Sequence, residues 1–224
     1  MLSPIKSNFK TEWFSLCLII ISIISGFYFW QNFPARVASH WGINGQVDGY
    51  SGPLLAAFLV PLMMLAMYIV FIIVPYLDPK KDQYMTFAPI YHKFKDLMIS
   101  FLFILYFLTG LNGLGFPIDV ALYVPVMVGA LFIIIGRLLK NVKMNWFMGI
   151  RTPWTMSSEK VWDKTHELSS RIFVISGLLM AATILVTTKL KIVFFVLAMA
   201  LIIFALPIYS YVLFIKEKKE NNSK

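Results

Sequence analysis

The sequence has few charged residues. Asp, Glu, Lys and Arg together make up 14% of its 224 residues, whereas soluble domains usually carry about a quarter. Hydrophobic residues make up 59%, and the mean hydropathy is +0.76. This composition is typical of an integral membrane protein and argues against a soluble enzyme.

Cysteine and catalytic signatures are also scarce. The single cysteine, Cys17, lies in an apolar stretch and cannot form an intrachain disulfide. The sequence contains no His-Glu-x-x-His, no Gly-x-Ser-x-Gly and no phosphate-binding glycine loop. We therefore expect no catalytic residues, no cofactor and no enzymatic activity.

Long apolar stretches without charge account for most of the chain. Stretches of 17 to 25 residues are long enough to cross the hydrocarbon core of a bilayer as helices. We expect an all-α, polytopic membrane helical bundle with about six transmembrane helices. The predicted spans are Trp13 to Gln31, Pro53 to Leu77, Leu97 to Pro117, Val120 to Gly136, Ile172 to Thr188 and Ile192 to Ile215.

The basic residues lie mainly on one predicted side. Of the 20 Lys and Arg residues, 17, including Lys6, occur in segments on the side of the N-terminus, and only Arg36, Lys189 and Lys191 occur on the other. Basic loops stay in the cytoplasm, so we expect both termini inside a bacterial cytoplasmic membrane. A basic excess can indicate contact with nucleic acid or with anionic lipid, and the high hydropathy favours the lipid bilayer. The tail KEKKENNSK should touch anionic headgroups.

The connecting segments leave no room for a separate soluble domain. We expect an N-terminal two-helix unit, residues 1–80, followed by a four-helix unit, residues 81–224. Two connections are long enough to form binding sites. One is an external loop in the first unit, Asn32 to Gly52, and the other is a cytoplasmic loop in the second, residues 138–170.

The external loop is rich in glycine and proline, which indicates a structured, hairpin-like turn and not a helix or regular strand. His40 and Asp48 are potential metal ligands, but a zinc site needs at least three protein ligands, so we expect no metal. They should instead hydrogen-bond the turns of the loop. Trp41 and Tyr50 should lie among the lipid headgroups.

Pro34, Arg36, Val37, His40, Gly45, Asp48 and Tyr50 follow a recognisable order. In this order the loop resembles a small domain of unassigned function that often precedes the SdpI domain in bacterial membrane proteins. That domain often has a second proline just before the histidine, where this chain has Ala38 and Ser39.

The cytoplasmic loop has an apolar first half and a helical second half. Trp146 and Phe147 should lie at the membrane interface or against the bundle. Arg151 must pair or stack with another group to offset the cost of desolvating its guanidinium. It could bind backbone carbonyls and so pin the loop, or it could bind a ligand directly. A helix capped by Ser157 or Ser158 should follow, with Trp162 and His166 on a shared face and His166 packing instead of acting as a base.

The residues Asn145, Gly149, Arg151, Thr152, Pro153, Trp154, Trp162 and His166 together resemble the hallmark motif of the SdpI family. Its members are membrane immunity proteins against a secreted killing factor. The resemblance implies protection from a toxin that acts on the membrane and, in the best-known member, capture of a cytoplasmic autorepressor when toxin is present. The expected partners are therefore a peptide toxin outside and a cytoplasmic repressor.

The leading hypothesis is a non-enzymatic immunity or sensor protein. A transporter or channel for a small amphiphile is the alternative, although the apolar runs lack ionisable residues at mid-depth, which disfavours ion coupling. A membrane enzyme is a third, weaker alternative. The candidate binding residues are Asn145, Gly149, Arg151, Thr152, Trp154, Trp162, His166, His40, Trp41, Asp48 and Tyr50.

Overall fold

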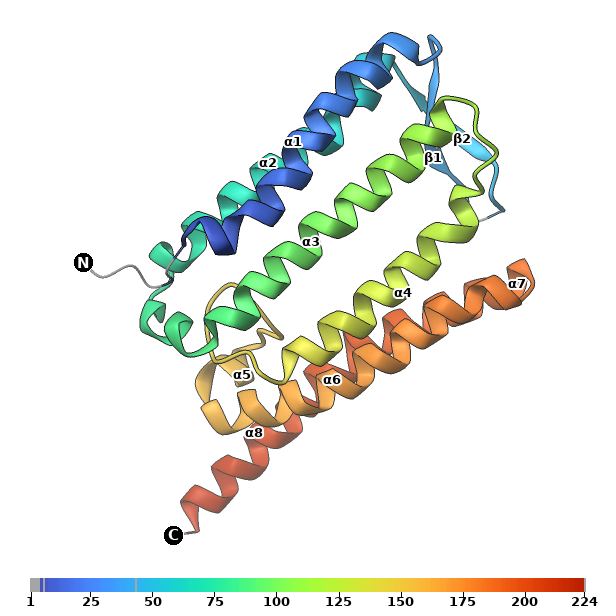
Figure 1. The fold of residues 1–224 in the computed structure, drawn as a ribbon. Coiled ribbons are helices and arrows are strands. Elements are labelled where there is room, and N and C mark those ends of the chain that lie inside the picture. Colours follow the sequence, from blue (N-terminus) through green and yellow to red (C-terminus); the bar gives the residue numbers. More distant parts are fainter. Residues whose placement is uncertain (1–4, 6, 43, 224) are drawn as a thin grey trace. The chain divides into compact units, whose positions relative to one another are not determined.

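The structure, a computed structural model, describes residues 5, 7–42 and 44–223 and is mainly helical. Lys6 and the last tail residue, Lys224, lie outside this part. Six helical segments are long and apolar enough to cross a membrane, which confirms the predicted all-α bundle. The elements, drawn in Figure 1, are α1 (Phe9–Asn32), β1 (Val37–Trp41), β2 (Val47–Ser51), α2 (Pro53–Leu77), η1 (Lys81–Gln83), α3 (Tyr84–Gly113), α4 (Val120–Leu139), α5 (Pro153–Ser157), α6 (Glu159–Ala181), η2 (Ala182–Leu185), α7 (Thr188–Ala200), η3 (Leu201–Ala205) and α8 (Leu206–Asn222).

The chain forms two compact units. One contains residues 6–73 and 92–127, and the other contains residues 1–5, 74–91 and 128–224. The predicted boundary at residue 80 divides the sequence in a different way and stays a prediction. So does the placement of both termini in the cytoplasm.

In the unit that contains residues 6–73, α1 and α2 pack beside α3 (Figure 1). Ile19 of α1, Met64 of α2 and Ile99 of α3 are fully or almost fully buried in one cluster. The Tyr106 hydroxyl donates to the Ala57 carbonyl over 2.8 Å, so a polar group inside this apolar core is satisfied. Large apolar side chains on the outer helix faces are exposed, as expected for surfaces that meet lipid.

The loop predicted to be external is a short antiparallel hairpin of β1 and β2. The expectation that it contains no regular strand was wrong. Gly45 has φ +84° at the turn, a conformation that suits glycine. A Cβ on Gly49 would lie 2.8 Å from the Cβ of His40 on the opposite strand, so only glycine fits there.

In the unit that contains residues 128–224, α4, α6 and α8 frame the motif loop. Gly129 of α4 meets Gly177 of α6 so closely that a Cβ on either would lie within about 2.6 Å of the other's carbonyl oxygen. Helix α6 begins after Ser158, whose hydroxyl accepts a hydrogen bond from the Val161 N–H. This confirms one of the two predicted capping serines. The segment η3, a π-helical turn, joins α7 to α8 ahead of Pro207.

Candidate functional site

Asn145 organises the loop between α4 and α5. Its side chain is fully buried, and its Oδ1 accepts hydrogen bonds from the N–H groups of Phe147 (2.9 Å) and Met148 (2.6 Å). Its Nδ2 donates to the carbonyls of Lys143 (2.8 Å) and Met148 (2.9 Å). A side-chain amide can donate two hydrogen bonds and accept two, so these four bonds occupy all of its donor and acceptor positions. Asn145 therefore folds the loop and is not free to bind a ligand.

Asp78 and Tyr84 hold this loop from outside the predicted motif. The Asp78 side chain is buried, and its Oδ2 accepts from the Tyr84 hydroxyl and from the Trp146 N–H, both over 2.9 Å. Its Oδ1 accepts from the Lys80 N–H over 2.7 Å. Neither residue was predicted from the sequence to belong to the site. The available signal was a lone aspartate directly after an apolar run, followed by Pro79.

Gly149, Trp162 and His166 meet beneath the loop. The Trp162 and His166 rings stack with centroids 4.1 Å apart, which confirms their predicted shared face. Gly149 has φ +116°, and a Cβ there would clash with the imidazole and lie 3.1 Å from the Trp162 ring. The fully buried Trp162 donates from Nε1 to the Val142 carbonyl over 2.8 Å. The indole thus joins α6 to the chain just after α4.

Both ring nitrogens of His166 bind backbone groups. Nε2 accepts from the Ile150 N–H over 3.0 Å, so Nε2 carries no proton. Nδ1 then carries the proton and donates to the Trp162 carbonyl, 2.9 Å away. The imidazole is neutral and 1% exposed. This arrangement supports the predicted packing role, because neither nitrogen is available to a substrate.

Thr152 and Trp154 connect the loop to α8. Thr152 caps α5 by accepting from the Thr155 N–H, and its hydroxyl lies 3.0 Å from the Ser210 hydroxyl. The rings of Trp154 and Tyr211 pack with centroids 5.0 Å apart.

Two aromatic side chains and one arginine of the loop are exposed. Trp146 is 52% exposed and Phe147 is 42% exposed, although they flank buried residues. Arg151 is also exposed, and its Nη1 donates to the Trp146 carbonyl. The guanidinium therefore pins the loop and still faces outward. The motif thus divides into a buried scaffold and an exposed aromatic and cationic surface.

The hairpin, in the unit that contains residues 6–73, brings His40 and Asp48 together. His40 Nδ1 bonds Asp48 Oδ1 across the strands, so the two residues pair with each other and not with the turns as predicted. Their side chains are 72% and 54% exposed. The Arg36 guanidinium lies 4.6 Å from the centre of the Tyr50 ring. Within the described ranges, no three His, Cys, Asp or Glu residues are grouped as a metal site.

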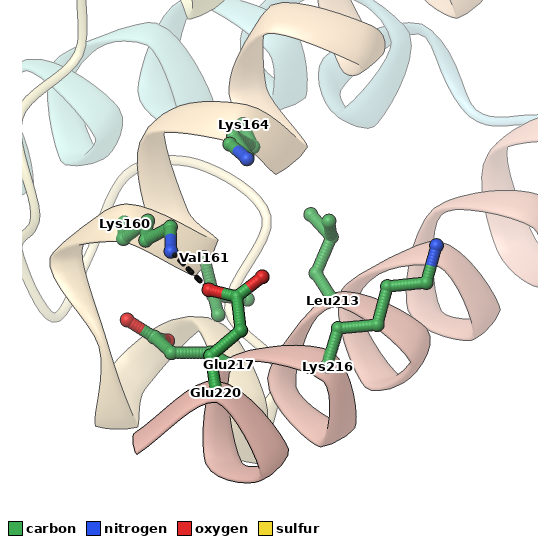
Figure 2. A pocket seen from close by; sticks show the side chains of 7 residues that line it. All are labelled: Lys160, Val161, Lys164, Leu213, Lys216, Glu217 and Glu220. Atoms are coloured by element: carbon green, nitrogen blue, oxygen red, sulfur yellow. Dashed lines mark hydrogen bonds and ion pairs between the residues drawn. The ribbon is translucent and has the colours of Figure 1, made fainter. Parts of the chain in front are cut away.

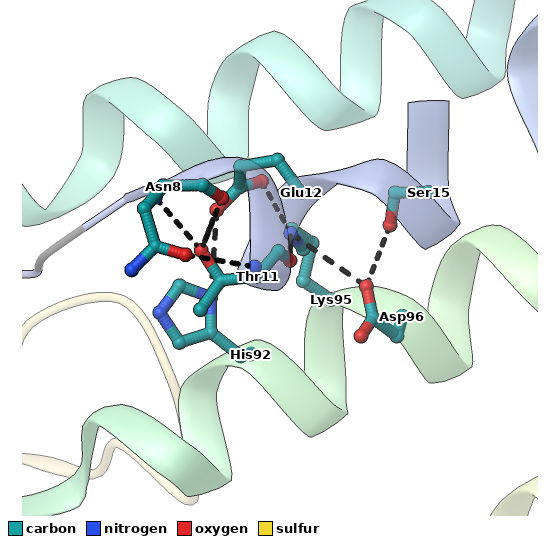
Figure 3. A network of polar contacts seen from close by, with 7 residues as sticks. All are labelled: Asn8, Thr11, Glu12, Ser15, His92, Lys95 and Asp96. Carbon is teal, nitrogen blue, oxygen red and sulfur yellow. Dashed lines mark hydrogen bonds and ion pairs between the residues drawn. The ribbon is translucent and has the colours of Figure 1, made fainter. Parts of the chain in front are cut away.

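A buried ionic cluster in the same unit joins α1 to α3 (Figure 3). Lys95 is 1% exposed, and its Nζ bonds Glu12 Oε2 and the Thr11 carbonyl, the latter over 2.9 Å. The Asp96 carboxylate lies 3.6 Å from Nζ and accepts a hydrogen bond from the Ser15 hydroxyl over 2.7 Å. His92 Nδ1 lies 3.6 Å from Glu12 Oε1. Lys95 lies before the predicted span that begins at Leu97, but it is part of α3, which begins at Tyr84.

Two family models match this chain, one in each of the two compact units. The family model for the SdpI/YfhL protein family matches residues 141–211, which include the motif loop. The model for a domain of unknown function, DUF1648, matches residues 17–65, which include the hairpin. The chain is 27% identical over 217 residues to Immunity protein SdpI of Bacillus subtilis (strain 168), covering 96% of this chain and 100% of that protein. No solved structure matches.

These matches confirm the resemblance to the SdpI family and the preceding small domain. Together with the six apolar helices, they identify a multi-pass protein of the bacterial cytoplasmic membrane.

Proposed function

Because this SdpI-like chain resembles Immunity protein SdpI over 96% of its length, we propose that it is a non-enzymatic immunity protein that protects the membrane against a peptide toxin. The structural observation that supports this role most directly is the use of polar groups in the motif loop. Asn145, His166 and Asp78 bond mainly backbone groups of their own unit. A catalytic site would keep such groups free for a substrate.

The exposed residues of the chain suit recognition of a peptide. Trp146 and Phe147 present large apolar surfaces beside the guanidinium of Arg151. Aromatic and arginine side chains dominate binding energy at protein interfaces. The hairpin offers a second surface of this type, where Arg36 lies over the exposed ring of Tyr50. On the predicted topology, the hairpin faces outward and would meet a secreted peptide first.

The experiment is survival of a sensitive bacterium across a panel of membrane-active peptides, with and without this protein. We expect resistance to at least one peptide. The double variant Trp41→Ala with Tyr50→Ala should weaken resistance at unchanged membrane abundance, because it removes the aromatic surface of the hairpin. The matched control is Trp13→Ala with Tyr28→Ala, which changes the same residue types at exposed positions of α1. Detergent serves as a control for general envelope effects, and equal killing of both strains by every peptide contradicts the proposal.

We also propose that the protein signals to a cytoplasmic repressor through the motif loop. The supporting observation is the exposed pair Trp146 and Phe147, which the buried scaffold holds in a fixed position on the predicted cytoplasmic side. Replacing both by alanine should abolish toxin-dependent recruitment of the partner while some resistance remains. Recruitment at the wild-type level in this variant contradicts the signalling role and leaves the immunity role in place.

A further inference from the structure

A groove in the unit that contains residues 128–224 lies between α6 and α8 (Figure 2). Val161 of α6 and Leu213 of α8 contribute its apolar lining. Its charged lining comes from three lysines and two glutamates, namely Lys160, Lys164, Lys216, Glu217 and Glu220. The groove therefore combines an apolar floor with an excess of positive charge.

The charges in the groove are not distributed evenly. Lys160 Nζ lies 3.0 Å from Glu220 Oε2, so this lysine is neutralised within the groove. Figure 2 shows Lys164 and Lys216 apart from this pair, with Leu213 between them. Neither forms an ion pair with a carboxylate in the part of the chain that the structure describes. Two ammonium groups are thus left for an anion from outside the chain.

The groove lies where α8 passes from apolar to polar sequence. Leu213 belongs to the last turn of the uncharged run, and Lys216 is the first charged residue after it. A helix changes in this way where it leaves the hydrocarbon core and enters the headgroup layer. At this depth the most abundant anions are the phosphates of acidic lipids. A phosphate bound between the two lysines would leave the adjoining acyl carbons next to Leu213.

We propose that the α6–α8 groove binds the phosphate headgroup of an anionic glycerophospholipid through Lys164 and Lys216. Charge complementarity and depth support this occupant, since basic pockets between membrane helices bind acidic headgroups. The lipid would bridge two helices that also hold the motif loop, because Thr152 and Trp154 contact α8 through Ser210 and Tyr211. This inference concerns a lipid site and does not depend on the proposed immunity function.

The test uses the purified full-length chain in detergent, titrated with phosphatidylglycerol and with phosphatidylcholine while bound lipid is counted by native mass spectrometry. We expect the wild-type chain to prefer phosphatidylglycerol. Lys164→Gln with Lys216→Gln should lower this preference by roughly fivefold per lysine. The matched control, Lys218→Gln with Lys219→Gln, removes the same charge from the same end of α8 outside the groove lining and should keep the preference.

Two further measurements make the test sharper. Glu217→Gln removes a negative charge from the groove and should strengthen phosphatidylglycerol binding, which a general loss of structure would not do. Glycerol 1-phosphate carries the phosphate without acyl chains and should compete poorly. The assignment would be overturned if the groove variant and the control variant lost the same amount of phosphatidylglycerol preference. It would also be overturned if glycerol 1-phosphate competed at the same concentration as the lipid. Displacement of the lipid by an acidic peptide at equal concentration would also overturn it, in favour of a protein partner.

Discussion

Replacing Lys95 by methionine tests whether the ionic cluster of α1 and α3 stabilises the fold. The ammonium of Lys95 lies between two carboxylates, with Nζ bonded to Glu12 and 3.6 Å from Asp96. The Lys95 side chain is 1% exposed and that of Glu12 is 10% exposed. Lys95→Met keeps an unbranched apolar side chain that is one atom shorter, but it leaves both carboxylates without the lysine cation.

The expected loss follows from this burial. Breaking a buried ion pair by removing one partner costs about 3–5 kcal/mol of unfolding free energy, because the remaining charge is uncompensated. Glu12→Gln should cost less, since Lys95 still bonds the Thr11 carbonyl at 2.9 Å and lies near Asp96. Combining both changes removes one of the uncompensated carboxylates. The double variant should therefore be more stable than Lys95→Met alone by about 1–3 kcal/mol.

The assay is reversible unfolding in mixed micelles, followed by circular dichroism. Lys93→Met is the matched control because Lys93 lies on the same helix but is exposed, and it should change stability by less than about 0.5 kcal/mol. Two outcomes would refute the reasoning. One is a Lys95→Met variant as stable as the control, and the other is a double variant whose loss equals the sum of the two single losses.

Three further predictions concern the motif loop and the topology. Gly149→Ala should abolish resistance at reduced membrane abundance, measured by survival and immunoblot, because its φ of +116° and the rings beneath it leave no room for a Cβ. Asp78→Ala should lower unfolding free energy by about 2–4 kcal/mol in the same micelle assay, because three buried or partly buried donors lose their acceptor. After replacement of Cys17 by Ala, a cysteine introduced at Ser51 should react with an impermeant thiol reagent in intact cells, because the hairpin is predicted to face outward. A cysteine introduced at Ser157 should not react. The reverse labelling pattern would show that the predicted orientation is wrong.

The six spans could be predicted from the sequence because crossing a bilayer demands a long uncharged run, and such runs are local features. Their ends were less predictable where a helix continues beyond the hydrocarbon core. Helix α3 begins at Tyr84 and not near the predicted Leu97, since the charges of its fourth turn are satisfied by the cluster with α1. From a single sequence, a charged residue within a helix cannot be distinguished from a charged residue in a loop.

The site was predictable only in part for a related reason. The motif residues lie close together along the chain, and the stacking of Trp162 on His166 followed from their spacing. Asp78 lies 68 residues before its partner Trp146, and nothing near it indicates that its carboxylate accepts from that N–H. The strands of the hairpin-like loop were missed because they are short and β2 contains Gly49, so turn residues dominated the pattern.

The division of the motif loop changes how its residues should be interpreted. A residue such as Asn145 or His166 keeps the loop folded, so its loss would reduce both resistance and signalling through one structural failure. Trp146 and Phe147 contribute little to that scaffold through their side chains, because their hydrogen bonds within it come from backbone groups. Their exposure costs free energy in water unless lipid or a partner covers them. The side chains that determine what this protein recognises should therefore be sought among the exposed residues of the loop, while the buried ones explain why the loop keeps one shape.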